Sequence, residues 1–183
     1  MLAFDCGLVD VGLHVLRDIR ASYDGTRRSP WNEIECGDHY TRPMAAFLLF
    51  EVASGQTWDA TRRALGFAPA LFNDAATGKF HGFFSNGASW GTYEQAPAAP
   101  DTGGGGAVAT ASLAVAYGTC ELESLTLGSV GKAATVTVSV GGKNVPCTVS
   151  AVDGGVELVF AGEGGGATCA ITAGSTLEVA LFA

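Results

Sequence analysis

The sequence contains few charged residues, and this scarcity limits what the protein can bind. Only 15% of its 183 residues are charged, and 10 Lys and Arg are outnumbered by 18 Asp and Glu, for a net charge of −8. Binding to nucleic-acid phosphates or to an anionic membrane surface requires clustered Lys and Arg. We therefore expect no nucleic-acid partner and no attachment to an anionic membrane.

Long apolar segments are also missing. The longest apolar run, residues 44–50, is far shorter than the roughly 20 residues that span a bilayer. The first residues, MLAFDCGLVDVG, include acids and lack the basic start of a signal peptide. The sequence therefore predicts no membrane span and favours a cytoplasmic location.

Paired cysteine motifs are absent as well. The five cysteines are widely spaced and form no CxxC pair, so neither a zinc ribbon nor a redox motif is indicated. We predict no metal and no cofactor. Buried free thiols are the simplest interpretation, and a disulfide between Cys147 and Cys169 stays open because spacing alone does not decide it.

Aromatic residues are scarce in the second half of the chain. Residues 1–96 hold fourteen of the seventeen aromatics, whereas residues 101–183 hold three aromatics and sixteen of the 26 glycines. The join reads APAAPDTGGGG, a Pro/Ala run followed by glycines that is typical of a linker. We therefore predict two units, 1–96 and 107–183, joined by a linker at 97–106.

The first unit is predicted to be helical. Apolar residues follow one face of a helix between residues 8 and 19. A second helix is expected over about 38–53, with Asp38 as N-cap, Ser54-Gly55 at its end, and a late start or a kink at Pro43. A short helical piece is expected at 58–65.

The second unit is predicted to be a small antiparallel β-sandwich. ATVTVSV at 134–140 alternates strictly, and GGKN leads to a returning segment at 145–152, which is a β-hairpin signal. Short alternating segments and glycine-rich turns favour a sandwich. The other strands are expected at 121–127, 156–160, 167–172 and 176–182.

Residues 29–42, SPWNEIECGDHYTR, contain the densest group of side chains suited to ligand binding or catalysis. Glu33 and Glu35 would point to the same side of an extended segment, about 7 Å apart. That separation is compatible with an inverting glycosidase, which places its two carboxyl groups about 6.5–9.5 Å apart. The simpler alternative is that one glutamate caps the following helix and the other faces solvent.

A sugar-binding interpretation accounts for more of this segment. The carboxylate of Glu33 and the guanidinium of Arg42 suit neighbouring sugar hydroxyls, while Trp31 and Tyr40 offer faces for a pyranose ring. Several alternatives stay open. Arg42 could pair with Glu35 or Asp38, His39 could be structural, Trp90 could pack in a core, and an oxygen-rich metal site could form from Glu33, Glu35, Asp38 and His39.

Three segments resemble glycoside hydrolase family 116, the bile-acid β-glucosidases and non-lysosomal glucosylceramidases. They are RRSPWNEIECGDHYTRPMAAF (27–47), GFAP (66–69) and FFSNGASWGTY (83–93), in that family's order. The resemblance covers roughly residues 5–95. It implies the C-terminal helices of an (α/α)6 barrel that hydrolyses β-glucosides with retention, followed here by the β-sandwich, so the expected fold class is α + β in two units.

The resemblance also implies roles for particular residues. In that family the nucleophile and the acid/base lie upstream of the matched region, so we expect no catalytic residue here and an inactive C-terminal fragment. Glu33 and Arg42 match the two residues that bind glucose hydroxyls. The expected partners are a β-glucoside and the rest of the barrel, and the alternative is a non-catalytic carbohydrate-binding or interaction module. The residues that would support the site are Trp31, Glu35, His39, Tyr40 and Trp90.

Overall fold

The chain divides into two units whose boundary differs from the predicted linker. A computed structural model describes residues 2–22, 26, 44–72, 76–96, 109–130, 133, 135–160 and 168–182. Its compact units are Met1–Ala53 and Ser54–Ala183. The strands of the aromatic-rich segment 54–96 therefore share a unit with those of the glycine-rich half. The predicted linker, 97–106, lies outside the described residues.

The first unit contains helices α1 (Leu2–Asp5), α2 (Val9–Ala21) and α3 (Met44–Ser54). Helix α2 confirms the helix predicted from apolar periodicity. Phe4 of α1 packs on Gly12 of α2, where a Cβ atom would lie only 2.5 Å from Cε2 of the Phe4 ring. Glycine at this position therefore lets the two helices approach. No helix in the described part of the chain is both long and apolar enough to cross a membrane.

Helix α3 ends where the sequence predicts. Gly55 has a φ of 61°, the left-handed conformation that glycine adopts readily after a helix end. The Ala68 amide donates a hydrogen bond of 3.0 Å to the carbonyl of Ser54. The Ser54-Gly55 helix end is thus confirmed. Asp38 and Pro43 lie outside the described residues.

The expected helical barrel is wrong. Among the described residues, three helices accompany twelve strands arranged in two sheets, and no helical barrel is present. The predicted helical piece at 58–65 is instead a hairpin of β1 (Thr57–Asp59) and β2 (Ala64–Phe67). Its turn is closed by Asp59, whose Oδ1 accepts hydrogen bonds from the amides of Thr61 at 2.9 Å and Arg62 at 3.2 Å. Periodicity cannot separate helix from strand over so short an apolar run.

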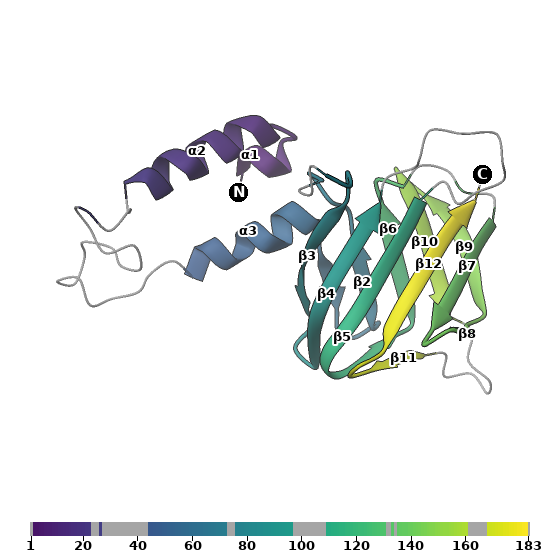
Figure 1. Cartoon of the computed structure of the whole chain (residues 1–183). Helices are drawn as coiled ribbons and strands as arrows, with labels where there is room; N and C mark the ends of the chain where they lie inside the picture. Colours follow the sequence, from purple (N-terminus) through teal and green to yellow (C-terminus); the bar gives the residue numbers. More distant parts are fainter. Residues whose placement is uncertain are drawn as a thin grey trace. The chain divides into compact units, whose positions relative to one another are not determined.

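The second unit is built from two sheets (Figure 1). The five-stranded sheet has the order β1-β2-β6-β10-β9, and the larger sheet has the order β3-β4-β5-β12-β7-β8, with β11 paired to β5. Strands β2 and β6 run parallel, and the other pairs are antiparallel. The remaining bounds are β3 (Phe80–Ser85), β4 (Ser89–Ala96), β5 (Ala109–Leu122), β6 (Ser124–Gly128), β7 (Thr135–Val140), β8 (Lys143–Asn144), β9 (Cys147–Val152), β10 (Gly155–Phe160), β11 (Cys169–Thr172) and β12 (Thr176–Phe182).

The hairpin predicted across GGKN is only partly present. Gly141 and Gly142 have φ angles of 56° and 78° and form the turn, but the returning strand β8 is two residues long. Pro146 follows, and proline cannot donate to a strand ladder. The chain then enters the other sheet as β9, which pairs with β10. The predicted pairing of 134–140 with 145–152 is therefore wrong.

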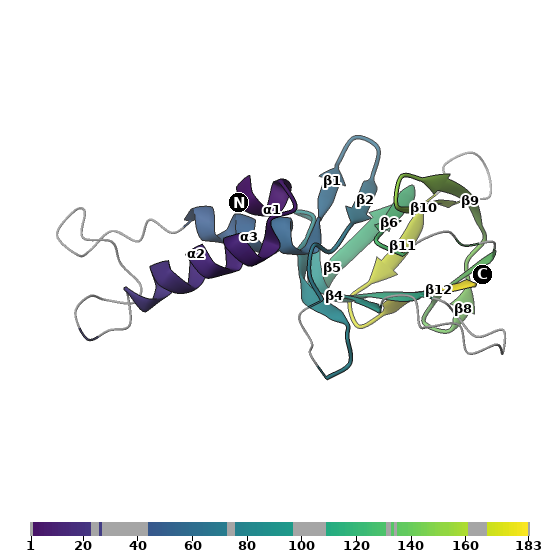
Figure 2. The same ribbon diagram turned by 90° about the horizontal axis from the view of Figure 1, so that it is seen from above.

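The core of the second unit lies between the two sheets, which form separate layers in Figure 2. Phe67 of β2 stacks on Tyr93 of β4, with ring centroids 3.7 Å apart and planes 6° from parallel. The Tyr93 hydroxyl donates to Oε1 of Gln95, whose Nε2 donates to the carbonyl of Gly128 at 2.9 Å. Burial raises the pKa of Tyr93, so its hydroxyl stays a donor. Apolar stacking and the hydrogen bond from Gln95 to Gly128 thus join the two layers.

The described cysteines are free thiols. Cys120 and Cys169 are buried and Cys147 is partly buried, as the simplest sequence interpretation predicts, whereas Cys6 is exposed. No disulfide joins Cys147 and Cys169. Burial, followed by the neighbouring Cys120 and Cys147, raises the pKa of Cys169 to about 11. These thiols therefore behave as small apolar core groups.

Candidate functional site: the outer face of the larger sheet

The predicted sugar-binding cluster lies outside the described residues. This applies to Trp31, Glu33, Glu35, His39, Tyr40 and Arg42, so the structure does not test their roles. Trp90 is the one predicted site residue that the structure describes. It lies on β4 with 47% of its surface exposed, which excludes the alternative of a buried core position.

The exposure of Trp90 follows from the alternation of its strand. Along β4 the buried side chains face the core, and the alternate ones face outward. The same alternation continues through β5 and β12. We call this surface, opposite the sandwich core, the outer face. Its side chains on β4 are Trp90, Thr92, Glu94 and Ala96.

Three aromatic side chains form a cluster at one end of the outer face, and we call Phe83, Trp90 and Tyr117 the aromatic triad. Trp90 stacks on Tyr117 with centroids 6.0 Å apart and planes 16° from parallel, and it lies 6.5 Å from Phe83. Phe83 is 50% exposed and Tyr117 is 64% exposed. The triad therefore presents broad aromatic surface to solvent from three adjacent strands.

An irregularity in the ladder places Tyr117 in this cluster. Trp90 pairs with Tyr117, but its neighbour Gly91 pairs with Val115, so Ala116 is an extra residue on β5. Such a bulge changes which side chains face outward. Gly91 is required here, because a Cβ atom would lie 1.9 Å from the carbonyl oxygen of Ala114. The bulge thus brings Tyr117 to the same face as Trp90.

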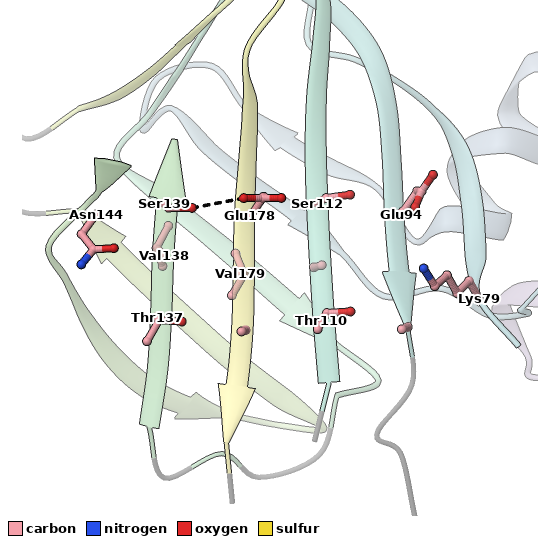
Figure 3. A pocket seen from close by; sticks show the side chains of 13 residues that line it. Lys79, Glu94, Thr110, Ser112, Thr137, Val138, Ser139, Asn144, Glu178 and Val179 are labelled. Carbon is pink, nitrogen blue, oxygen red and sulfur yellow. Dashed lines mark hydrogen bonds between the residues drawn. The ribbon is translucent and has the colours of Figure 1, made fainter. Parts of the chain in front are cut away.

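Polar side chains cross the outer face in register, one from each of six neighbouring strands. The pairings link His81 to Glu94, Glu94 to Ser112, Ser112 to Glu178, Glu178 to Ser139, and Ser139 to Asn144. We call these six residues the polar row. Figure 3 shows Glu94, Ser112, Glu178 and Ser139 side by side, with Thr110 and Thr137 at the next level.

The two carboxylates of the polar row are held by neighbouring side chains. Ser139 donates to Glu178 Oε2 over 3.4 Å, drawn as the dashed line in Figure 3. His81 Nδ1 contacts Glu94 Oε1 at 2.8 Å. Each carboxylate keeps its other oxygen available as a hydrogen-bond acceptor for a ligand. Each carboxylate is therefore oriented by one neighbouring side chain and can still accept a hydrogen bond from a ligand.

The members of the polar row other than His81 line a shallow depression of about 390 Å³. Lys79 and Asn144 lie among its lining residues, together with the threonines of the next level. The floor is a rigid sheet rather than a loop, so the polar groups have defined positions. Such a surface suits the binding of an extended polar molecule.

The arrangement does not suit glycoside cleavage. Glu94 and Glu178 lie two strands apart, so their Cα atoms are about 10 Å from each other. Glu178 is exposed, and the side chain of Glu94 is 42% exposed. A general acid needs a site that excludes water and raises its pKa. This open face therefore lacks the enclosure that a general acid requires.

Sequence reasoning found one member of the triad and missed the other two. Phe83 lies in FHGFFS, where three phenylalanines alternate imperfectly, and only the pairing shows which one faces outward. Tyr117 reaches the outer face through the bulge. Glu94 and Glu178 are 84 positions apart in the sequence and meet through β5.

Comparisons with known proteins add little. No protein-family profile matches the chain, and no curated protein matches it, so the resemblance to family 116 gains no support. A solved structure, the GH127 β-arabinofuranosidase, is weakly similar, with a TM-score of 0.33 and 13% identity over 68% of this chain and 18% of that one. The chain thus spans less than a fifth of that glycoside hydrolase, and similarity at this level carries no argument about function.

Proposed function

We propose that the outer face of the larger sheet binds a carbohydrate chain without cleaving it. The observation that carries this proposal is the aromatic triad, which stands exposed beside a row of hydroxyl and carboxylate groups on one rigid sheet. The C–H bonds on the face of a sugar ring are apolar and slightly positive, so they pack on the negative face of an aromatic ring. The hydroxyls at the ring edge then need polar partners.

The side chains around the triad favour a sugar over a protein surface. Protein interfaces have apolar centres in which aromatic residues are joined by other large apolar side chains. Among the described residues, the triad supplies the only large apolar side chains that the larger sheet exposes. Its neighbours on the face are Ser85, Thr92, Ala114 and Thr176.

Replacing Trp90 tests the proposal directly. In the full chain, Trp90→Ala is expected to weaken binding to a responsive glycan about 30-fold, because truncating a central aromatic contact costs about 2 kcal/mol. Trp90→Phe should keep part of the affinity. A glycan array followed by calorimetry gives the measurement, and thermal unfolding checks that the fold is intact.

Phe50→Ala is the matched control, because Phe50 is similarly exposed but lies on α3. It should leave binding unchanged. If no glycan binds, or if Trp90→Ala binds like the wild type, the proposal is wrong. Concentration-dependent self-association that Trp90→Ala abolishes would instead assign the triad to a protein interface.

We also propose that residues 29–42 grip a glucose unit in a β-glucosidase, a role supported by their composition and by the family 116 resemblance. In a complete enzyme carrying this chain, Glu33→Ala and Arg42→Ala should each lower kcat/KM, since losing a hydrogen bond to a charged group costs about 1.5–3 kcal/mol. Hydrolysis of an aryl β-glucoside is the measurement. Unchanged kcat/KM in both variants would remove the proposed roles.

A further inference from the structure

We infer that the polar row is the second half of the same binding site and restricts its ligand to oligosaccharides without acidic groups. This inference rests on the proposed carbohydrate binding and adds the class and the minimum size of the ligand. It is carried by the separation of Glu94 from Trp90 along β4 and by the charges along the row.

The separation sets the length of the ligand. Trp90 and Glu94 lie on the same side of β4, four residues apart, so their Cα atoms are about 13 Å from each other. A single sugar ring stacked on Trp90 does not reach Glu94. A ligand that contacts Trp90 and Glu94 together must therefore contain several linked sugars.

The register defines a path across the row. From Glu94, the strands bring Ser112, Glu178 and Ser139 to the same level at intervals of about 4.8 Å. Hydroxyls and carboxylates thus alternate along a line. Hydroxyl groups of a sugar donate to the carboxylates and both donate to and accept from the serines.

The charges set the class of the ligand. Glu94 and Glu178 lie on either side of Ser112, so a carboxylate or sulfate held there would face two negative charges. Lys79 lines the same depression, and His81 already contacts Glu94. Two carboxylates against one lysine leave the row acidic. Uncharged sugars meet no electrostatic repulsion from the two carboxylates, whereas uronic acids and sulfated sugars are repelled.

The test compares two ligand series on the full chain. Gluco-oligosaccharides of one to six units and oligogalacturonates of the same lengths are titrated by calorimetry at low salt. We expect the affinity for gluco-oligosaccharides to rise at least tenfold between one and four units. Oligogalacturonates should bind at least tenfold more weakly than gluco-oligosaccharides of equal length.

The double variant Glu94→Gln/Glu178→Gln removes the two negative charges and keeps the size of both side chains. It should weaken binding of gluco-oligosaccharides several-fold and reduce the difference between the two series to less than threefold. Glu157→Gln is the matched control, since this glutamate lies on β10 of the other sheet. It should change neither series.

The outcomes distinguish the two proposals. If gluco-oligosaccharides bind through Trp90 but neither chain length nor the double variant matters, the role of the polar row is wrong and the triad remains the site. Equal or tighter binding of oligogalacturonates also overturns it. If neither series binds the wild type, the proposed carbohydrate site itself is wrong.

Discussion

A chain that begins at residue 97 is expected not to fold, although it keeps every strand predicted for the second unit. Such a chain loses β1–β4, so β5 loses its partner β4 and β6 loses its partner β2. Its core also loses five large buried side chains. At about 1.5–3 kcal/mol each, their loss is on the order of 10 kcal/mol, comparable to the whole stability of a domain. They are Leu65, Phe67, Phe80, Phe84 and Tyr93.

The matched comparison is a chain that begins at Ser54, the first residue of the second unit. It should show a β-sheet circular dichroism spectrum and unfold in one cooperative transition. The shorter chain should show neither, and its amide protons should exchange rapidly. A cooperative transition in the chain from residue 97 would mean that the first four strands are peripheral to the sandwich.

Replacing Phe67 by alanine is expected to remove about 3–5 kcal/mol from the free energy of unfolding. Phe67 is 1% exposed and joins the two layers through its stack on Tyr93 and an edge contact with Phe84. Truncation leaves a cavity between rigid sheets that cannot close around it. Urea unfolding of the full chain, monitored by fluorescence, gives the measurement.

Phe83→Ala makes the same chemical change on β3 of the other sheet and serves as the control. Phe83 is 50% exposed, so its truncation should cost less than about 1 kcal/mol while weakening glycan binding. Equal destabilisation by the two variants would mean that the outer face is packed against something in solution. A large loss from Phe83→Ala alone would reverse the assignment of inner and outer faces.

Much of the local structure could be predicted from the sequence. The periodicity of 8–19 predicts α2, Ser54-Gly55 predicts the end of α3, and strict alternation predicts strands such as β7. These features depend on neighbouring residues and on φ preferences, which the sequence carries directly. The hairpin at β1–β2 was missed because a short apolar run beside residues that favour helices does not distinguish the two periods.

The candidate site could be predicted only in part. The sequence points to Trp90 through its place in the segment 83–93, which resembles family 116, and leaves core packing open as the alternative. Tyr117 depends on the bulge opposite Gly91, and the approach of Glu94 to Glu178 depends on β5 lying between β4 and β12. No local pattern encodes a pairing between strands so far apart. The polar row therefore exists only once the sheet is assembled.

The sequence by itself determined the acidic balance, the scarcity of charge, the ends of helices and the alternation of individual strands, because each depends on composition or on adjacent residues. The tertiary structure decided that segment 54–96 belongs to the sandwich, that β7 and β9 lie in different sheets, and that aromatic and polar side chains share one face. The physical reason is that strands satisfy their hydrogen bonds with distant partners. Which partner is chosen depends on the apolar area that the whole sandwich buries.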